Sequence, residues 1–456
     1  MKYPKYSEYK DSGVEWIGII PKGWEVKKLS QCLSRLESGN REVGGGNQLK
    51  DGVFSIGGEH IDWEGNISLT NPKYIKESFY FNLNSGKVKE EDILLVKDGA
   101  TIGKIAHVKE FPVKQVAINE HVFLLRTNRL LHSKFLYYFL YSKIGQTQIL
   151  SNVRGAAQGG LNSSFVQKLY ISIPQLLVQK NISSFLDNEI ERLSKLIYKE
   201  NNIISLLKEK RQAIITNEVT KGLDPNVPMK DSDVDWIGEI PEHWTVMKVK
   251  HTSYVKGRVG WKGLTTEEYL EDGYAYLVTG QDFQSKTIIW DSCYCVDKRR
   301  YDDDPYIQLK NGDLLITKDG TIGKLAIVDE LEKPACLNSG IFLVRPYGYY
   351  NTDFLYYVLC STVFYNFYFL KSFGSTIQHL YQNVFEGFSF PIPPMEEQSK
   401  IVAYLEREIG KIDKIISAGE RMVQLLKEYK TSLISQAVTG KIDVRDFAAS
   451  STSYNA

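Results

Sequence analysis

The chain has 456 residues, 43% of them hydrophobic and 24% charged, which is the composition of a globular protein long enough for several domains. The formal net charge of +1 excludes a histone-like or polybasic protein, but it leaves room for a local basic face that binds nucleic acid. The amino terminus is polar, no apolar run approaches the length of a membrane span, and the five cysteines are scattered. We therefore expect a cytoplasmic protein without a membrane segment.

The first recognisable element, residues 10–29, recurs 220 positions later as residues 230–249. The two segments read KDSGVEWIGIIPKGWEVKKL and KDSDVDWIGEIPEHWTVMKV, and 12 of 20 positions are identical. Their glycines and prolines predict an extended conformation, and we call them the lead-in segments. Identity at this level is far beyond chance, so the chain is one structural plan written twice in tandem.

Divergent inserts follow the lead-in segments, at residues 36–91 and 255–312, and share almost nothing that can be aligned. A shared frame with divergent inserts indicates the same task performed on two different targets. Basic, amide and aromatic side chains in the inserts suit base edges in a DNA major groove, although each is also ordinary on a protein surface. The candidate base-reading residues are Arg41, Gln48 and Lys50 in the first copy and Lys256, Arg258, Trp261 and Lys262 in the second.

Short β-type runs come next, at residues 93–96 and 122–125 and again at 314–317 and 341–344, and they predict a mixed, β-rich domain. Between the runs, KDGATIGK and KDGTIGK predict a strand–turn–strand hairpin. Such a turn offers backbone N–H groups, hydroxyls and ammonium groups to a DNA phosphate, while a purely structural glycine turn stays open as an alternative. The candidate contacts are Lys97, Thr101, Lys104, Lys318, Thr321 and Lys324.

None of the motifs predicts catalysis by this chain. The turn is too short for a nucleotide-binding P-loop, and Ile105 and Leu325 stand where that loop needs Ser or Thr. No cofactor-binding glycine loop and no Ser/His/Asp arrangement is visible in the sequence. Cys293-x-Cys295 lacks the second pair that a metal site needs, so we expect buried thiols there. We expect no catalytic residue, metal or cofactor on this chain.

The segments FLYYFLYS, from Phe135, and FLYYVLCS, from Phe354, predict short amphipathic helices under the sheet. A polar loop that starts with glycine then precedes the last strand of each copy. We expect these loops to contact the DNA backbone. The candidate residues are Gln158 and Asn162 in the first copy and Gln378 and Tyr381 in the second.

Each copy ends in a long predicted helix, after Pro174 and after Pro394. Aliphatic residues recur in both helices with the same spacing of 4, 4, 3, 4, 7 and 3, which is typical of a coiled-coil seam, whereas a surface helix packed on its own domain is the alternative. Connectivity makes such a pair antiparallel, and about 40 helical residues would separate two heads by roughly 60 Å. The seam comprises Ile182, Leu186, Ile190, Leu193, Ile197, Ile204 and Leu207 with Ile401, Leu405, Ile409, Ile412, Ile416, Val423 and Leu426.

Polar residues interrupt the seam twice in each copy, at Glu200 and Asn201 with their counterparts Gly419 and Glu420, and at Arg211 with its counterpart Lys430. Such residues can fix the register of a helix pair at some cost in stability, or they can simply face solvent. The sequence leaves both interpretations open.

The order of these motifs resembles the specificity subunit of type I restriction–modification systems. The resemblance rests on the IPxxW part of the lead-in segment, the KDG-TIGK hairpin, the FLYY helix, and a polar loop leading to IxIPxxxxQ and a long helix. That last motif is ISIP at residues 171–174 with Gln179, and FPIP at residues 390–393 with Gln398. The first copy departs from the usual Pro-Glu-Gln form, because it has Leu177 and Val178 before Gln179.

The resemblance implies an α+β protein built as a tandem pseudo-two-fold repeat. Two target-recognition domains, joined by two helices in an antiparallel coiled coil, would each read one half of a bipartite site on double-stranded DNA. The predicted bounds are 1–175 and 223–393 for the lead-in segments with their domains, 176–222 and 394–443 for the helical spacers, and 444–456 for a disordered tail.

The resemblance further implies that the helices dock two adenine-methyltransferase subunits, to which motor–nuclease subunits can add. S-adenosylmethionine, ATP and Mg would then bind to those partners, and this chain would be non-catalytic. The alternative function is a protein–protein scaffold with two peptide-binding heads. Salt distinguishes the two, because DNA binding weakens steeply as salt rises.

Overall fold

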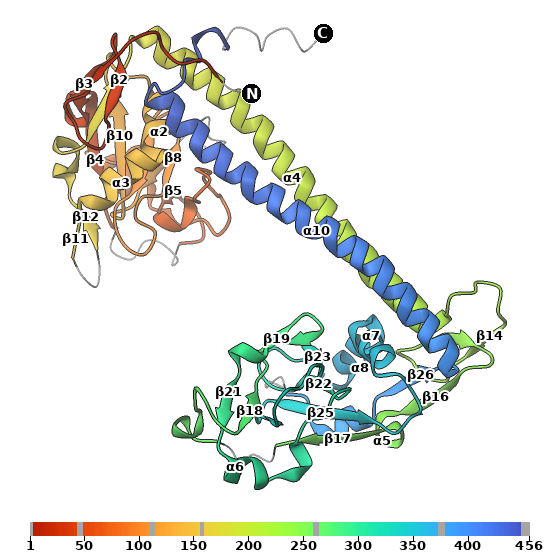
Figure 1. Cartoon of the computed structure of the whole chain (residues 1–456). Coiled ribbons are helices and arrows are strands. Elements are labelled where there is room, and N and C mark those ends of the chain that lie inside the picture. Colours follow the sequence, from red (N-terminus) through yellow and green to blue (C-terminus); the bar gives the residue numbers. More distant parts are fainter. Residues whose placement is uncertain are drawn as a thin grey trace. The chain divides into compact units, whose positions relative to one another are not determined.

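The structure is a computed structural model that describes residues 3–42, 49–109, 115–155, 159–258, 264–372 and 379–447. The chain divides into two compact units. Unit 1 contains Met1–Glu200 and Arg421–Ala456, and unit 2 contains Asn201–Glu420. Unit 1 is therefore assembled from both ends of the chain, whereas unit 2 is one continuous segment (Figure 1).

The main sheet of each unit has four antiparallel strands in the same order. In unit 1 the order is β4 (Leu33–Ser38), β10 (Val122–Thr127), β7 (Ile93–Val96) and β8 (Ile105–His107). In unit 2 it is β17 (Ser253–Gly257), β25 (Ile341–Pro346), β22 (Leu314–Thr317) and β23 (Leu325–Ile327). The four β-type runs of the sequence are β7, β10, β22 and β25, and all four predicted strands are confirmed.

A second sheet of three strands is built mainly from the divergent inserts. Its order is β6 (Tyr74–Ile75), β5 (Val53–Ile56) and β9 (Val116–Ile118) in unit 1, and β21 (Tyr294–Val296), β18 (Ala275–Val278) and β24 (Ala335–Leu337) in unit 2. In each sheet the central strand has one antiparallel and one parallel neighbour. Inserts that cannot be aligned by sequence therefore adopt one topology.

The lead-in segments form a small hairpin followed by one strand. The hairpin strands are β1 (Tyr9–Asp11) with β2 (Ile19–Pro21), and β14 (Met229–Asp231) with β15 (Glu239–Pro241). The following strands β3 (Glu25–Lys28) and β16 (Thr245–Lys248) pair with the last strand of each domain, β13 (Tyr170–Ile173) and β26 (Ser389–Ile392). Trp24 and Trp244 are buried, so the second tryptophan of each lead-in segment anchors it in the core.

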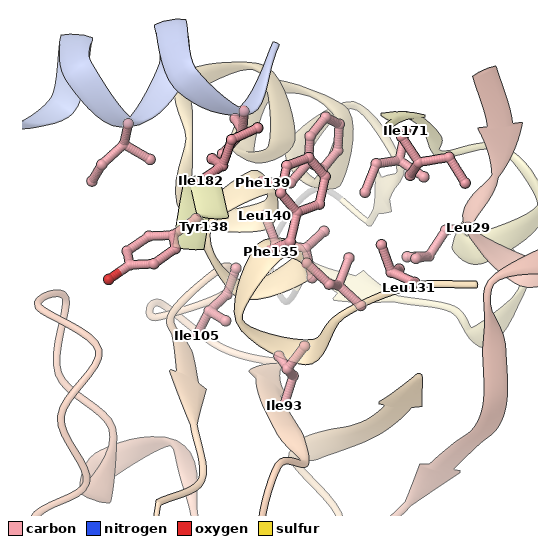
Figure 2. Close-up of a cluster of buried hydrophobic side chains, with 14 of the residues drawn as sticks. Leu29, Ile93, Ile105, Leu131, Phe135, Tyr138, Phe139, Leu140, Ile171 and Ile182 are labelled. Atoms are coloured by element: carbon pink, nitrogen blue, oxygen red, sulfur yellow. The ribbon is translucent and has the colours of Figure 1, made fainter. Parts of the chain in front are cut away.

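Two short helices cover the main sheet in each unit: α2 (Ser133–Tyr141) and α3 (Lys143–Ser151), and α7 (Thr352–Cys360) and α8 (Thr362–Ser372). The predicted FLYY helices are α2 and α7, whereas α3 and α8 were not predicted. Figure 2 shows side chains of α2, Phe135 among them, between Ile93 of the main sheet and Ile182 of the long helix that follows. Apolar burial between sheet and helices therefore forms the core of each unit.

The remaining elements are short. They are β11 (Val153–Arg154), β12 (Gly160–Leu161), β19 (Phe283–Gln284), β20 (Thr287–Ile288), α1 (Glu77–Asn82), α5 (Val249–Thr252), α6 (Lys298–Asp302), α9 (Gln382–Glu386), and the 3-10 turns at Leu29–Gln31, Gly58–His60, Ser163–Gln167, Thr266–Glu268, Trp290–Ser292, Pro305–Ile307 and Arg445–Phe447.

The long helices are α4 (Leu176–Lys221) and α10 (Met395–Val438). In unit 1, Leu186 of α4 shares a core with Leu433 of α10, and in unit 2, Ile215 of α4 shares a core with Ile401 of α10. The early part of one helix thus packs on the late part of the other, so the pair is antiparallel (Figure 1). Every residue of the predicted seam is buried or half-buried.

Polar residues of the seam have partners on the opposite helix. Lys208 Nζ lies 2.9 Å from Glu420 Oε1, and Arg211 Nε lies 2.9 Å from Asp413 Oδ1. In unit 1, Lys430 Nζ donates to Ser194 Oγ at 3.3 Å. Arg211, Glu420 and Lys430 thus have contacts across the helices, while the side chains of Arg211 and Glu420 are also 40% and 54% exposed, so both interpretations stay open.

The glutamines of the IxIPxxxxQ motif are fully buried clamps. Gln179 accepts a hydrogen bond from His132 N at 2.8 Å and donates to the carbonyl oxygens of Leu130 and Pro174, each at 2.9 Å. Gln398 accepts from Asn351 N at 2.8 Å. Each side chain ties the turn before α2 or α7 to the first turn of a long helix, and removing it would leave buried polar groups unpaired. The motif therefore holds the frame.

The predicted tail needs a correction. Val444 is buried, and Phe447 contacts the ring of Tyr3 with centroids 5.3 Å apart. Asp443 N donates to Pro4 O at 2.8 Å. Residues 444–447 thus belong to unit 1, because the end of the chain completes the core beside the first lead-in segment. Residues 448–456 lie outside the described part.

Candidate nucleic-acid interface

The KDG turns are residues 97–104, which join β7 to β8, and residues 318–324, which join β22 to β23. Both predicted hairpins are present. Each turn holds two glycines with positive φ: Gly99 (83°) and Gly103 (94°) in unit 1, and Gly320 (67°) and Gly323 (82°) in unit 2. A side chain at these positions would strain the backbone, which explains why the glycines recur.

Two neighbouring segments clamp the backbone of the first lysine of each turn. Lys97 N donates to His121 O at 2.9 Å, and Leu161 N donates to Lys97 O at 2.8 Å. Lys318 N donates to Gly340 O at 2.9 Å, and Leu380 N donates to Lys318 O at 3.0 Å. The structure therefore brings the KDG turn and the polar loop before the last strand together, in the same way in both units.

The three predicted residues of the unit 1 turn, Lys97, Thr101 and Lys104, are all half-buried. The Lys97 ammonium lies 5.1 Å from the centroid of the Phe123 ring, and the Lys104 ammonium lies 6.0 Å from that of Trp63. Thr101 is half-buried between them. Asn162 is exposed on the adjoining loop, where its Oδ1 accepts from Ser164 N at 2.9 Å. These four residues surround one turn and leave donors accessible to an anion.

In unit 2 the KDG turn forms one side of an open groove of about 1180 Å³. Thr321 and Lys324 are exposed in it, while the Lys318 ammonium lies 5.2 Å from the Phe342 ring. Tyr381 is 58% exposed and meets the His379 ring edge-on at 4.6 Å. The groove is lined by Leu264, Tyr269, Thr279, Gly280, Gln281, Asp282, Ser292, Tyr294, Thr317, Asp319, Gly320, Thr321, Lys324, Asn338 and Gly340.

The lining of this groove combines hydroxyl, amide and carboxylate groups with about as much apolar surface, beside one exposed lysine. Asp319 is paired with His379, so part of its charge has a local partner. A surface of mixed donors and acceptors is better suited to the edges of bases than to a uniform row of phosphates.

Three further candidates have distinct surroundings. Arg41 is exposed, with Nε 3.7 Å from Glu120 Oε1, and Glu120 in turn lies 3.5 Å from His121 beside the KDG turn. Lys50 is exposed. Lys256 lies on the edge strand β17 with its ammonium 5.6 Å from the Tyr306 ring centroid. Arg41 therefore lies near the KDG turn of unit 1, to which Glu120 and His121 link it.

Arg258 was predicted to read bases, and the structure corrects this. Its side chain is buried, with 2% exposed, and its Nε donates to Leu337 O at 2.9 Å. One terminal nitrogen reaches Cys336 Sγ at 3.6 Å. The guanidinium provides a hydrogen-bond donor for the last carbonyl group of strand β24, and from this buried position it cannot reach a base edge. Burial raises the pKa of Cys336 to about 11, even though the charge of Arg258 lowers it.

Five predicted residues lie outside the described part of the chain, and they are Gln48, Gln158, Trp261, Lys262 and Gln378.

Sequence reasoning missed Asn119 and Asn338. Asn119 N donates to Ile56 O and Asn338 N to Val278 O, both at 2.9 Å, so the two residues join the second sheet at equivalent points. Asn338 lines the groove. The signal was present in the sequence, because the two asparagines recur at the offset of 219 just before the strands β10 and β25.

The described residues hold no group of three or more His, Cys, Asp or Glu side chains placed to bind a metal ion. Cys293 and Cys295 are buried thiols, and burial raises the pKa of Cys293 to about 12. Among the helices of the described part, none is both long and apolar enough to cross a membrane.

Each unit thus carries a β-rich domain with a matched KDG turn and one end of each long helix. The pattern of the family described as type I restriction modification DNA specificity domain matches residues 21–205 and 263–418. The chain belongs to this family, and it is a specificity subunit, which determines the DNA target of a type I restriction–modification system.

One relative extends over nearly the whole chain and another over about half of it. The MjaVIII specificity subunit of Methanocaldococcus jannaschii is 24% identical over 436 residues, which are 94% of this chain and 95% of the relative. The EcoKI specificity subunit of Escherichia coli is 24% identical over 211 residues, 45% of this chain and 44% of the relative.

Solved structures share the fold. A chain from a study of complex assembly and conformational transition in a type I restriction–modification system has a TM-score of 0.71 at 17% identity, covering 93% of this chain and 99% of that one. The HsdS subunit of Thermoanaerobacter tengcongensis has a TM-score of 0.52 at 18% identity, covering 93% and 98%. At these identities the likeness concerns the fold alone.

Proposed function

We propose that each domain reads one half of a bipartite DNA target. Its KDG turn contacts the sugar–phosphate backbone of the DNA, and the adjoining insert contacts the bases. The observation that carries this proposal is the contrast between frame and insert. Turn, clamp and sheet order recur in both units, while the side chains around the turn differ. A fixed scaffold with exchangeable contacts suits two reading heads for two sequences.

The helices α4 and α10 then have two roles in this proposal. They set the spacing between the half-sites, and they dock two adenine-methyltransferase subunits. Large apolar side chains on the helices support docking, because they stay exposed beside the buried seam. They are Leu196, Tyr198, Ile203, Leu206, Ile415, Met422, Leu425 and Tyr429.

Catalysis belongs to the partners in this proposal. The chain would be non-catalytic alone, with S-adenosylmethionine, ATP and Mg bound by methyltransferase subunits and by any motor–nuclease subunits of the complex.

An exchange of residues 25–175 for the same region of another specificity subunit tests the division of labour. We expect one half of the methylated site to change and the other half to stay, because unit 2 is left intact. The measurement is the sequence of methylated sites in cells that express the hybrid with its methyltransferase partner. A hybrid that methylates the original site in both halves would contradict the proposal.

A further inference from the structure

A four-residue turn follows the central strand of the second sheet in both units. We call residues 57–60 the β5 turn and residues 279–282 the β18 turn; they read Gly-Gly-Glu-His and Thr-Gly-Gln-Asp. The register of the parallel pairing makes them equivalent, since Phe54 pairs with Val116 in unit 1 and Tyr276 pairs with Ala335 in unit 2. The two turns lie in the inserts, where only their glycine is shared.

Both turns close with the same hydrogen bonds. His60 N donates to Gly57 O at 3.0 Å, and Gly57 N donates back to His60 Nδ1 at 2.9 Å. Asp282 N donates to Thr279 O at 3.2 Å, and Thr279 N donates to Asp282 Oδ2 at 2.7 Å. The fourth side chain of each turn is buried and anchors it, so the third residue is presented from a fixed backbone.

The shared glycine lets each turn approach the end of the first strand of its KDG hairpin. A Cβ on Gly58 would lie 2.9 Å from Val96 Cγ1 and 3.4 Å from Thr101 Oγ1. A Cβ on Gly280 would lie 2.7 Å from Thr317 Cγ2. Because the backbone approaches this closely, the turn sits against the end of the first hairpin strand in both units, next to the start of the KDG turn.

The third residues are Glu59 and Gln281, and both are exposed. Gln281 lines the groove together with Thr321 and Lys324. At one structurally equivalent point, one unit therefore presents a carboxylate and the other an amide. A carboxylate accepts from the amino group of cytosine, whereas glutamine pairs in a bidentate way with N6 and N7 of adenine.

The surroundings of Glu59 suit a carboxylate beside DNA. Lys73 forms an ion pair with it and offsets the repulsion from phosphates. Partial burial opposes ionisation, yet hydrogen bonds from Lys73 and from the Glu59 backbone N–H, with the charges of Lys73 and His60, hold the pKa of Glu59 below its ordinary value. An ionised carboxylate has about four lone-pair sites, so it keeps acceptor capacity for a base after it has accepted from one lysine and one backbone N–H.

We propose that Glu59 and Gln281 are specificity-determining residues, each reading one base pair of its half-site in the major groove. Glu59 selects a cytosine and Gln281 selects an adenine. This inference rests on the proposed function, because it needs each domain to face one half-site.

The test exchanges the two chemistries. Glu59→Gln and Gln281→Glu are each assembled with the methyltransferase partner, and the complexes are selected against a library randomised in both half-sites. We expect Glu59→Gln to change one position of the first half-site from cytosine to adenine, and Gln281→Glu to change one position of the second from adenine to cytosine. The preference should change by about tenfold or more.

The unaltered half-site is an internal control for folding, because a misfolded chain would lose both halves. Gln284→Glu is the matched control, since Gln284 is exposed on β19 of the same unit and does not line the groove. It should leave the base preference unchanged. If a variant keeps the original preference at every position, or loses affinity equally for all sequences, the assignment of that residue as a base reader is overturned.

Failure of the proposed function itself has a different signature. In that case the unaltered complex would select no bipartite sequence from the library. If only this inference fails, the unaltered complex still selects its bipartite sequence, and the variants show one of the two outcomes that overturn it.

Discussion

The lysines of the KDG turns occupy two kinds of position, one at the start of the turn and one at its end, and the position determines whether the lysine holds the turn in place or is free to contact a phosphate. Lys97 and Lys318 rest over phenylalanine rings and have their backbone clamped on both sides, so they hold the turn in place. Lys104 and Lys324 close the turn at the start of β8 and β23, where Lys324 is exposed in the groove. Lys324 is therefore the best placed of the four to meet a phosphate, and Lys104 holds the equivalent position in unit 1.

Lys104→Ala and Lys324→Ala should each weaken DNA binding by a similar factor for all sequences. One lost phosphate contact should also reduce the slope of log affinity against log salt by about 1. The measurement is a salt titration of the assembled complex on specific and random DNA. Lys400→Ala, on α10, serves as the control because this lysine pairs with Glu396. A change in base preference at one position would show that the lysine reads a base.

A bidentate ion pair also recurs at the residue scale. Arg126 bonds both oxygens of Asp92 at 2.7 Å, and Arg345 bonds both oxygens of Asp313 at 2.7 Å. Each aspartate precedes the first strand of the KDG hairpin and is buried. These arginines stabilise the frame, so a positive charge by itself does not identify a residue that contacts DNA.

The long helices are the elements whose regular spacing predicted them best. A seam with a period near 3.5 residues buries one aliphatic stripe against the partner helix and leaves the opposite face to solvent or to another protein. Leu186 is fully buried in the core of unit 1, whereas Leu196, ten residues later on α4, is 41% exposed.

Leu186→Ala should lower the free energy of unfolding by about 2–5 kcal/mol, because it leaves a cavity in a packed core. Leu196→Ala removes the same atoms from an exposed position and should change the free energy by less than about 1 kcal/mol. Urea denaturation of the isolated chain, followed by circular dichroism, measures both. Equal losses for the two variants would contradict the assignment of the seam.

The chain as a whole closes on itself within unit 1. Tyr9 Oη donates to Gly440 O at 3.1 Å, and Ile442, Val444 and the ring of Phe447 complete the core beside the first lead-in segment. In unit 2 the lead-in segment instead follows α4 directly. Both units therefore place the end of a long helix beside a lead-in segment, although unit 1 must bring together residues from opposite ends of the chain.

Removal of residues 439–456 should destabilise unit 1 and leave unit 2 protected. Loss of the buried side chains Ile442 and Val444 costs about 3 kcal/mol or more in apolar burial. Hydrogen exchange resolves the two units, and β10 should exchange faster while β25 does not. Removal of residues 448–456 alone is the matched control and should change neither. Equal protection of unit 1 after both deletions would contradict its assembly from both chain ends.

The sequence alone determined the repeat, the hairpins, the FLYY helices and the seam. These features depend on identity at a fixed offset or on local periodicity, which are visible within a few tens of residues. The candidate site could be predicted only where it belongs to the frame, as at Lys97 and Lys318. Asn119 and Asn338 could have been found in the same way.

The tertiary structure decided the rest. The inserts share a topology that their side chains do not reveal, because strand pairing depends on backbone hydrogen bonds and on burial rather than on residue identity. The same pairing turned Arg258 inward, and it brought Glu59 and Gln281 to equivalent points beside the KDG turns. Contacts between residues far apart in the chain set these positions, so no local pattern could have predicted them.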